Sequence, residues 1–286
     1  MAEERLESRR SDGPENRFAR HPAATLAIVL SIGFLACVVA VELLLRTFSG
    51  LGHPPLYELS PLFGYRLKAN QVIEPKRGLG FLYGARVTTN NLGLRGAGHW
   101  DANPERKVLF LGDSVTYGGQ YVADAQLFSS VAGRSLPGWQ VGNGASNAWG
   151  VENIAGLVVD YGFCPARVVV TCVLEADFYR GLTRASSVPL WTETPRAALQ
   201  DLLMHFVWRA NESRYGGSVE PLIDDAAHLD RIAQRAAMRL KQMDGYLRGR
   251  GVRHLVFLLP TRSHVVEGDS PDRRVRRLLQ RQGIPA

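Results

Sequence analysis

Apolar and polar positions divide the first part of the chain into two contrasting stretches. Residues 1–22 are polar and charged, whereas residues 23–45 are apolar almost throughout. At 1.5 Å per residue, a helix over the second stretch would be about 34 Å long, which exceeds the thickness of a bilayer's hydrocarbon core. The pattern predicts a disordered tail followed by a transmembrane helix, with the lipid bilayer as a partner.

Arginines on either side of this helix predict its orientation. Five of them precede residue 23, whereas Arg46 and Arg66 alone follow within about twenty residues of its end. We therefore expect a cytoplasmic N-terminus and a main domain outside the cytoplasm, in the periplasm or the extracellular space. A cleaved signal peptide, a lipoprotein cut before Cys37 and a buried soluble helix are the alternatives. The apolar run continues beyond Cys37, which favours the uncleaved anchor.

From Lys107 onward, short apolar runs alternate with stretches of helical periodicity. Strands that alternate with helices favour a parallel sheet covered on both faces. We therefore predict an α/β fold, a flavodoxin-like three-layer α/β/α sandwich with a parallel sheet. The predicted strands cover residues 108–111, 139–141, 167–174 and 252–259, and the predicted helices cover residues 124–136, 151–161 and 229–250.

Two further stretches complete the predicted domain organisation. Residues 46–104, rich in Gly, Pro and Asn, are predicted to form a juxtamembrane segment of turns and short strands. The α/β domain would then cover residues 105–286. Residues 183–226 break its alternation and are predicted to be an insertion, either a lid or a wall that faces the substrate.

The net charge of +7 comes from one end of the chain. Residues 1–238 hold equal numbers of basic and acidic side chains, whereas residues 239–286 hold 11 basic and 4 acidic ones. Five of these arginines, in the last turns of the sequence, recur at helical spacing, which is typical of a solvated helix face. No aromatic residues interleave with them, so nucleic acid is not an expected partner.

The spacing of cysteines and histidines indicates no metal site, and no glycine-rich nucleotide loop follows a strand, so neither a metal nor a cofactor is expected.

One serine stands at the end of the first predicted strand of the sheet. That strand runs into the sequence Gly-Asp-Ser-Val-Thr-Tyr-Gly over residues 112–118. Ligands of open α/β sheets lie beyond the carboxyl ends of the strands. A serine on a tight turn that leads into a helix exposes its hydroxyl there and offers its backbone N–H to an oxyanion. The same tripeptide recurs at residues 268–270 without a preceding strand, so the context singles out Ser114.

The turn around Ser114 resembles the opening motif of the SGNH, or GDSL, hydrolase family. This resemblance covers more than half of the chain and implies that Ser114 is the nucleophile, supported by Asp113. The glycine of the family's second motif, whose backbone N–H helps to hold the oxyanion, falls on Ala148. The third motif, Gly-x-Asn-Asp, aligns with residues 174–177 and places Asp177 at its aspartate.

The third motif departs from the family pattern at its oxyanion donor. The asparagine that donates in the family is Ala176 here, and alanine has no side-chain donor. Losing one such donor typically lowers turnover by about 10²–10³-fold. Asn143 and Asn147, in the loop after the second strand, are candidate replacements and candidate substrate-binding residues. Tyr179 and Arg180 follow the third motif and are candidate contacts for a sugar.

A second departure concerns the catalytic base. In the family, Asp-x-x-His after the last strand supplies the base and its orienting carboxylate. No such sequence follows the strand predicted at residues 252–259, and the chain stops where the next strand is expected, so we expect it to be truncated relative to its fold. His264 follows that strand and is the candidate substitute base. Asp225 and His228 have the right spacing but precede the long predicted helix, so Asp225 is expected to cap it.

The resemblance implies an ester hydrolase or an O-acyltransferase that acts through a serine nucleophile on an acyl ester. Anchored relatives make acyl esters of envelope carbohydrate the implied substrate class. With no base in place, the chain is expected to hydrolyse an activated acetyl ester little faster than its Ser114→Ala form. The alternative is a catalytically inactive SGNH-like module that serves binding or assembly in the cell envelope.

Overall fold

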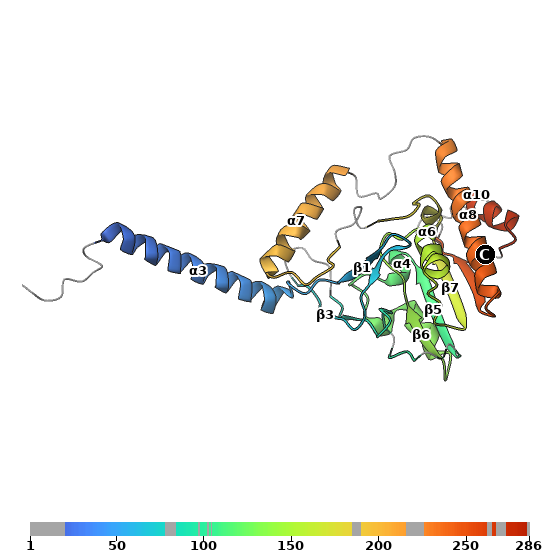
Figure 1. The fold of residues 1–286 in the computed structure, drawn as a ribbon, viewed down its shortest axis with the longest axis horizontal. Coiled ribbons are helices and arrows are strands. Elements are labelled where there is room, and N and C mark those ends of the chain that lie inside the picture. The colour runs from blue at the N-terminus through green and yellow to red at the C-terminus, as the bar shows by residue number, and fades with distance from the viewer. Residues whose placement is uncertain are drawn as a thin grey trace, which may run out of the picture.

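A long apolar helix precedes a domain of strands and helices in the computed structural model of this protein. The helix, α3 (Pro22–Ser49), projects from the rest of the molecule (Figure 1). Among the described residues, it is the one helix that is long and apolar enough to cross a membrane. It continues beyond the predicted end at residue 45 and stops at Gly50, whose φ of 64° is left-handed. The structure describes residues 21–77, 84–96, 98–101, 103, 105–184, 190–215, 226–261, 265–266 and 273–284.

Four parallel strands form the central sheet, in the order β6-β5-β7-β8 (Figure 1). Every ladder between them is parallel. β5 and β7 are buried almost along their whole length, because the layers on both sides cover them. Each predicted strand is present, with its ends shifted by a residue or two. The bounds are Lys107–Gly112 for β5, Gln140–Asn143 for β6, Val168–Val173 for β7 and Arg253–Leu258 for β8.

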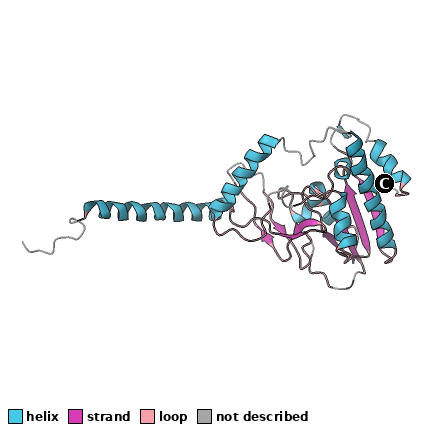
Figure 2. Cartoon of the chain, turned by 45° about the horizontal axis from the view of Figure 1, so that its top comes forward, coloured by secondary structure: helices cyan, strands magenta, loops and turns pink. Residues whose placement is uncertain are grey.

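Helices cover both faces of this sheet. α6 (Val151–Ala155) and α8 (Ala226–Arg248) lie on one face, where they enclose the larger apolar core. On the other face lies α5 (Phe128–Arg134), where the Phe128 ring meets the Phe110 ring of β5 edge-on at 5.7 Å. The molecule therefore contains the predicted α/β sandwich of three layers with a parallel sheet (Figure 2).

Two predicted helices differ from the expectation in detail. The first splits into a 3₁₀ turn, η1 (Asp124–Gln126), and α5, because Leu127 between them has non-helical backbone angles. In the second, α6 gives way to one π-helical turn, η2 (Gly156–Asp160). A Cβ at Gly156 would lie 2.1 Å from the Leu62 carbonyl oxygen, so glycine is what lets η2 approach the neighbouring loop.

Short strands in the predicted juxtamembrane segment pack onto the α/β domain. The Tyr65 hydroxyl donates to the Asn147 carbonyl at 2.5 Å, and the Trp149 indole donates to the Tyr65 carbonyl at 2.8 Å. These contacts make the segment a wall beside the loop that follows β6. Its two antiparallel pairs are β1 (Tyr57–Ser60) with β2 (Gly64–Leu67), and β3 (Val72–Ile73) with β4 (Val87–Thr88).

The predicted insertion contains one long helix beside the apolar helix. This helix, α7 (Ala198–Tyr215), packs against α3 (Figure 1). Its first two N–H groups, of Ala198 and Leu199, donate to the Glu42 carboxylate of α3 at 2.7 and 3.2 Å. The Asp201 carboxylate accepts from the buried Lys76 ammonium at 2.8 Å. The insertion is therefore fastened to the end of α3 and to the juxtamembrane segment.

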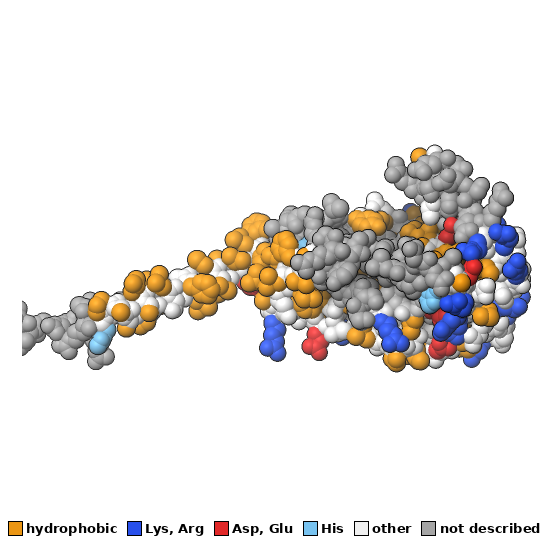
Figure 3. Space-filling model, turned by 90° about the horizontal axis from the view of Figure 1, so that it is seen from above, with side chains coloured by type: hydrophobic (Ala, Val, Ile, Leu, Met, Phe, Trp, Pro, Cys, Tyr) orange, Lys and Arg blue, Asp and Glu red, His pale blue; other side chains and the backbone are white. Residues whose placement is uncertain are grey.

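Helix α10 (Arg273–Arg281) carries the arginine cluster on its exposed side. Its buried residues Val275 and Leu279 join the main core next to α8, whereas Arg276 and Arg277 are exposed. Figure 3 shows basic side chains gathered at the end of the molecule opposite α3. The predicted amphipathic arginine helix is thus present.

Candidate active site

Ser114 is the first residue of α4 (Ser114–Tyr117), two residues after β5. A Cβ at Gly112 would lie 2.2 Å from the Thr116 hydroxyl oxygen and 2.5 Å from the Cys172 carbonyl oxygen of β7. Glycine at position 112 therefore lets the chain turn from strand into helix close beside β7. Ser114 is half-buried, and it lies at the edge of the sheet where ligands of parallel α/β folds bind.

Asp113 supports this turn from within the fold. Its side chain is fully buried, and its Oδ1 atom accepts the Val115 N–H at 2.9 Å, which caps the start of α4. The Ser114 hydroxyl lies 3.5 Å from Asp113 Oδ2. Among the described residues, Asp113 is the one carboxylate in hydrogen-bond contact with this hydroxyl.

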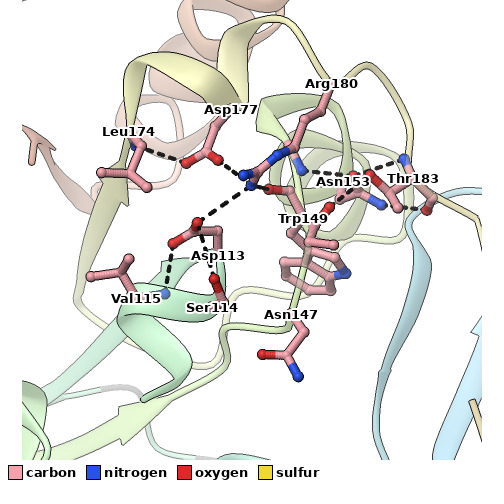
Figure 4. A network of polar contacts seen from close by, with 12 residues as sticks. Asp113, Ser114, Val115, Asn147, Trp149, Asn153, Leu174, Asp177, Arg180 and Thr183 are labelled. Carbon is pink, nitrogen blue, oxygen red and sulfur yellow. Dashed lines mark hydrogen bonds and ion pairs between the residues drawn. The ribbon is translucent and has the colours of Figure 1, made fainter. Parts of the chain in front are cut away.

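Arg180 joins the first and third motifs in one polar network (Figure 4). Its Nη1 atom lies 3.3 Å from Asp113 Oδ2 and 2.6 Å from Asp177 Oδ1. The same atom donates to the Trp149 carbonyl at 3.2 Å. Asp177 in turn accepts the Leu174 N–H at 2.7 Å, which closes the turn after β7. One guanidinium thus faces two buried carboxylates and ties the loops after β5, β6 and β7 together.

Two buried carboxyl groups that share one guanidinium compete for its positive charge. Burial, followed by the negative charge of Asp113, raises the pKa of Asp177 to about 8, although Arg180 opposes the shift. Burial and Arg180 thus act on the pKa of Asp177 in opposite directions, and burial has the larger effect.

Ala148, at the position of the family's second-motif glycine, has left-handed backbone angles. Its φ is 57°, in a region that glycine adopts more readily than alanine. The Thr183 hydroxyl holds the loop in this shape by donating to the Ala148 carbonyl at 2.7 Å. Within the described ranges, the backbone N–H groups of Ser114 and Ala148 have no hydrogen-bond acceptor. Free N–H groups of this kind are what an oxyanion site requires.

The two candidate asparagines have different surroundings. Asn143 is buried, and its amide donates to the Thr116 carbonyl at 2.5 Å while its Oδ1 atom accepts the Ala145 N–H, so this side chain is engaged in fastening α4 to the loop after β6. Asn147 is half-buried, and its side chain has no partner among the residues that the structure describes. In Figure 4 its amide points away from the Arg180 network. The Asn147 amide is therefore free of protein partners within the described ranges, whereas the Asn143 amide is engaged.

No histidine in the described part of the chain hydrogen-bonds to Ser114. His254, on β8, is almost completely buried, with Nδ1 3.2 Å from the Asp244 carboxylate and Nε2 2.9 Å from the Thr171 hydroxyl. Burial lowers the pKa of His254, although Asp244 opposes the shift. Because Asp244 lies on α8 and Thr171 on β7, these contacts fasten α8 to the sheet.

The remaining candidates are placed as follows. His264 and Asp225 lie outside the described residues, so the expected roles of base and helix cap stay predictions. His228 lies in the first turn of α8, where the long helix was expected to begin. Tyr179 is half-buried, packs against the main core and directly precedes Arg180. Within the described ranges, no group of three His, Cys, Asp or Glu side chains could hold a metal ion.

A second buried arginine supports the turn from the juxtamembrane side. The Arg95 guanidinium has no exposed surface, pairs with the Asp124 carboxylate at 2.9 Å and donates to the Tyr117 carbonyl at 2.6 Å. It also donates to the carbonyls of Gly119 and Val122. The loop after α4 is therefore held by one side chain from the juxtamembrane segment.

Sequence reasoning missed the structural roles of both arginines. Arg180 was a candidate sugar contact, whereas the structure shows it paired with Asp113 and Asp177, and Arg95 was not singled out. The available signal was the pair of aspartates in motifs that end buried strands. A buried carboxylate requires a cation or several donors, and an arginine three residues after Asp177 is in reach.

Comparisons with known proteins show a distant structural similarity. No protein-family model matches the chain, and no curated protein matches it. Among solved structures, it is similar to the crystal structure of a member of the lipolytic protein G-D-S-L family from Veillonella parvula DSM 2008. That protein is 12% identical, the match covers 62% of this chain and 95% of that chain, and the TM-score is 0.26. This similarity is too weak to bear on the site, whose description rests on the geometry above.

Proposed function

We propose that this protein is a serine-dependent acyl-ester hydrolase or O-acyltransferase whose catalytic domain is held at a membrane by α3. The observation that supports the proposal is the placement of Ser114, a half-buried residue at the start of a helix on the carboxyl edge of a parallel sheet. The N–H groups of Ser114 and Ala148, in the loops after β5 and β6, are free of acceptors within the described ranges, and we propose that they bind the oxyanion.

In the proposed reaction, the Ser114 Oγ atom attacks the acyl carbonyl carbon, and the alcohol of the ester leaves with a proton. The acyl group then passes from the serine to water or to a sugar hydroxyl, which restores the enzyme. The N–H groups of Ser114 and Ala148 would hold the oxyanion of each intermediate, with the Asn147 amide as a third donor. Ala176 supplies no donor, which lowers the expected rate.

Removal of the Ser114 proton is the slow step expected of this arrangement. The acceptor in contact with the hydroxyl is Asp113 Oδ2, and that atom is also paired with Arg180. Both oxygens of this carboxylate are already engaged, Oδ1 with the Val115 N–H and Oδ2 with Arg180. His264, outside the described residues, stays the candidate base. The proposal therefore expects slow acylation that depends on Ser114.

The substrate class and the location are further parts of the proposal. The resemblance to the SGNH family supports acyl esters of envelope carbohydrate as substrates. Tyr179, half-buried next to Arg180, offers an aromatic ring near the site for contact with a sugar. The excess of arginine before α3 supports a cytoplasmic N-terminus and a catalytic domain on the other side of the membrane.

Hydrolysis of 4-nitrophenyl acetate by the full chain in nanodiscs tests this function. The wild-type rate is expected to be only a little above background, and Ser114→Ala is expected to lower it to background, whereas Ser270→Ala, in the second copy of the same tripeptide, leaves it unchanged. Ala176→Asn restores a side-chain donor and is expected to raise the rate by about 10-fold or more. Adding Ser114→Ala to that variant should return the rate to background. Equal rates for the wild type, Ser114→Ala and Ala176→Asn would contradict the proposal.

One observation favours a second function, a non-catalytic module that binds acylated carbohydrate in the cell envelope. Arg180 forms an ion pair with Asp113, the carboxylate that contacts Ser114. Ala176 lacks the side-chain donor that an oxyanion site of this family would use. For such a module, an acetylated oligosaccharide would bind the wild type and Ser114→Ala equally, and no variant of the series above would show serine-dependent turnover. Binding by calorimetry, measured beside the ester assay, distinguishes the two functions.

A further inference from the structure

Helix α7 presents an apolar surface on its outward side, which is the reverse of what a solvated helix presents. Four exposed residues recur at the spacing of one helix face, and Leu203 and Val207 keep 57% and 55% of their surface. Large apolar side chains gathered on one exposed face mark a contact site. We call this face the α7 stripe; its members are Leu199, Leu203, Phe206 and Val207.

The opposite side of α7 is fixed to the protein. Ala198 and Asp201 are buried, and the Asp201 carboxylate accepts from the Lys76 ammonium at 2.8 Å and from the Gly52 N–H at 3.0 Å. On a helix, Asp201 and Leu203 point about 160° apart. The α7 stripe therefore lies on the side of α7 opposite these buried contacts.

Contacts with α3 fix the level of α7 relative to a bilayer. α3 has 28 residues, of which about 20 are needed to cross the hydrocarbon core. Because Glu42 and Arg46 form an ion pair, residues 42–49 belong at the level of the headgroups, with residues 22–41 in the core. The Glu42 carboxylate accepts the first N–H groups of α7. Helix α7 therefore begins where the hydrocarbon ends.

Helix α7 lies beside the end of α3 that is nearer the α/β domain. In Figure 1 it leaves α3 at a steep angle, and Figure 3 shows apolar side chains continuing from α3 onto the adjoining part of the molecule. We propose that residues 199–207 form a second membrane contact, in which the α7 stripe inserts between lipid headgroups and acyl chains. An amphipathic helix binds a bilayer in this way, in the plane of the interface. The inference rests on the proposed spanning of the membrane by α3.

A membrane-bound α7 would also orient the candidate active site. The chain runs from Arg180 and Thr183, which hold the loop around Ala148, into the insertion that contains α7. With α3 and α7 both bound to lipid, the domain would have two attachments and could not rotate freely about the axis of α3. The site around Ser114 would then keep a constant direction and height relative to the membrane.

Spin labelling of the full chain in nanodiscs of phosphatidylcholine and phosphatidylglycerol tests the inference. Each protein carries one cysteine, with the other native cysteines replaced by alanine. Labels at Leu203→Cys and Phe206→Cys report on the α7 stripe, the label at native Cys37 is the lipid reference within α3, and Met238→Cys is the water reference. Met238 is a matched control because it is an exposed apolar residue on α8, far from α3 (Figure 1). Collisions with oxygen, which concentrates in lipid, and with a water-soluble nickel chelate are measured for each label.

The inference predicts that the labels at positions 203 and 206 lose access to the nickel chelate and keep access to oxygen, as the Cys37 label does. If these labels behave like the Met238 label while Cys37 is in lipid, the α7 stripe faces water and the inference is overturned, with the membrane span intact. Low access to both probes would mean that protein covers the stripe, which also overturns it. Free access of the nickel chelate to the Cys37 label would overturn the span and the inference together, without bearing on the chemistry of Ser114.

Discussion

Two buried networks pair carboxylates with a basic side chain at different levels of the same sheet. The first lies at the carboxyl edge and contacts the half-buried Ser114. The second lies under α8, where a hydroxyl, an imidazole and a carboxylate follow one another as they do in a catalytic triad. The Arg180 network consists of Asp113, Arg180 and Asp177, and the His254 network consists of Thr171, His254 and Asp244.

The two networks differ mainly in where they lie along the strands, and less in the types of residue that they contain. Thr171 has no exposed surface and the His254 side chain is 1% exposed, so no substrate reaches them. His254 is in register with Val169 and Leu109. Leu109 precedes Gly112 by three residues on β5, so His254 and the turn at Gly112 lie roughly 10 Å apart along the strands. The accessible serine therefore has a guanidinium nearby, and the histidine has a buried hydroxyl. A serine, a histidine and an aspartate in one domain do not by themselves make a catalytic triad.

Removing the Arg180 side chain should have the largest effect. Arg180→Leu is expected to cost about 3–5 kcal/mol of unfolding free energy, because it leaves Asp113 and Asp177 buried without a cation. The loss is measured by denaturant unfolding of the full chain in detergent, followed by tryptophan fluorescence. The control is Arg86→Leu, which breaks the exposed pair with Glu74 and should change the free energy by less than about 1 kcal/mol. Equal losses in both variants would mean that the Arg180 network does not stabilise the fold.

Removing the imidazole of the His254 network should lower stability by less and leave the chemistry unchanged. His254→Ala leaves the Thr171 hydroxyl and the Asp244 carboxylate without this partner, at about 1–3 kcal/mol of unfolding free energy. The rate of ester hydrolysis should equal that of the wild type under conditions where both proteins are folded. A rate that drops to the level of Ser114→Ala in a folded protein would show that His254 takes part in catalysis. The His254 network would then be catalytic, and not only structural as the comparison holds.

The two networks should respond to pH with opposite sign. The pKa of Asp177 is raised to about 8 in the folded state, against an ordinary value of 3.8. Between these values the folded state binds more protons than the unfolded state, so this group makes the unfolding free energy fall as the pH rises from about 4 to about 8. His254 has a lowered pKa, so its contribution makes stability rise with pH up to its ordinary value near 6.5. Asp177→Asn should therefore flatten the fall toward alkaline pH, and His254→Gln should flatten the rise below neutral pH. Unfolding free energies measured across this pH range check both slopes; unchanged profiles in both variants would contradict the assignments.

The smallest expected effect concerns the left-handed loop position beside Ser114. Ala148→Gly removes the strain of a positive φ but adds the flexibility of glycine to the unfolded chain, so a gain of about 0–1 kcal/mol is expected. Ala145→Gly, in the same loop, is the control, because the Ala145 methyl group is buried and its loss should destabilise by about 1 kcal/mol. Denaturant unfolding measures both. A destabilisation by Ala148→Gly as large as that by Ala145→Gly would show that the loop is not strained at residue 148.

Most of the fold followed from apolar patterning. β7 came from a continuous apolar run, and α3 and α8 came from length and periodicity. β8 was predicted as a buried strand, whereas in the structure it is an edge strand whose residues are half-buried or exposed. The π-helical turn η2 and the break at Leu127 did not follow, because they depend on packing between distant segments, such as the close approach of Gly156 to Leu62. The contact between α7 and α3 could not be predicted from the sequence for the same reason.

The site was predicted in part. Ser114 at the end of a buried strand followed from a local motif, and the structure places it there. Ala148, which aligns with a family glycine, has a positive φ, and its role as an oxyanion donor stays a prediction. The pairing of Arg180 with Asp113 did not follow, because it joins residues far apart in sequence whose distance depends on the whole sheet. Whether His264 acts as a base stays a prediction.

Identification of the serine that reacts with a fluorophosphonate tests the central claim most directly. The full chain in nanodiscs is treated with an alkyl fluorophosphonate, which forms a stable bond with a reactive serine oxygen, and the modified peptide is found by mass spectrometry. We predict modification of Ser114, none of Ser270, and none of Ser114→Ala. Modification of another residue, or none of the wild type and of Ala176→Asn under conditions that modify an active serine esterase, would contradict the account.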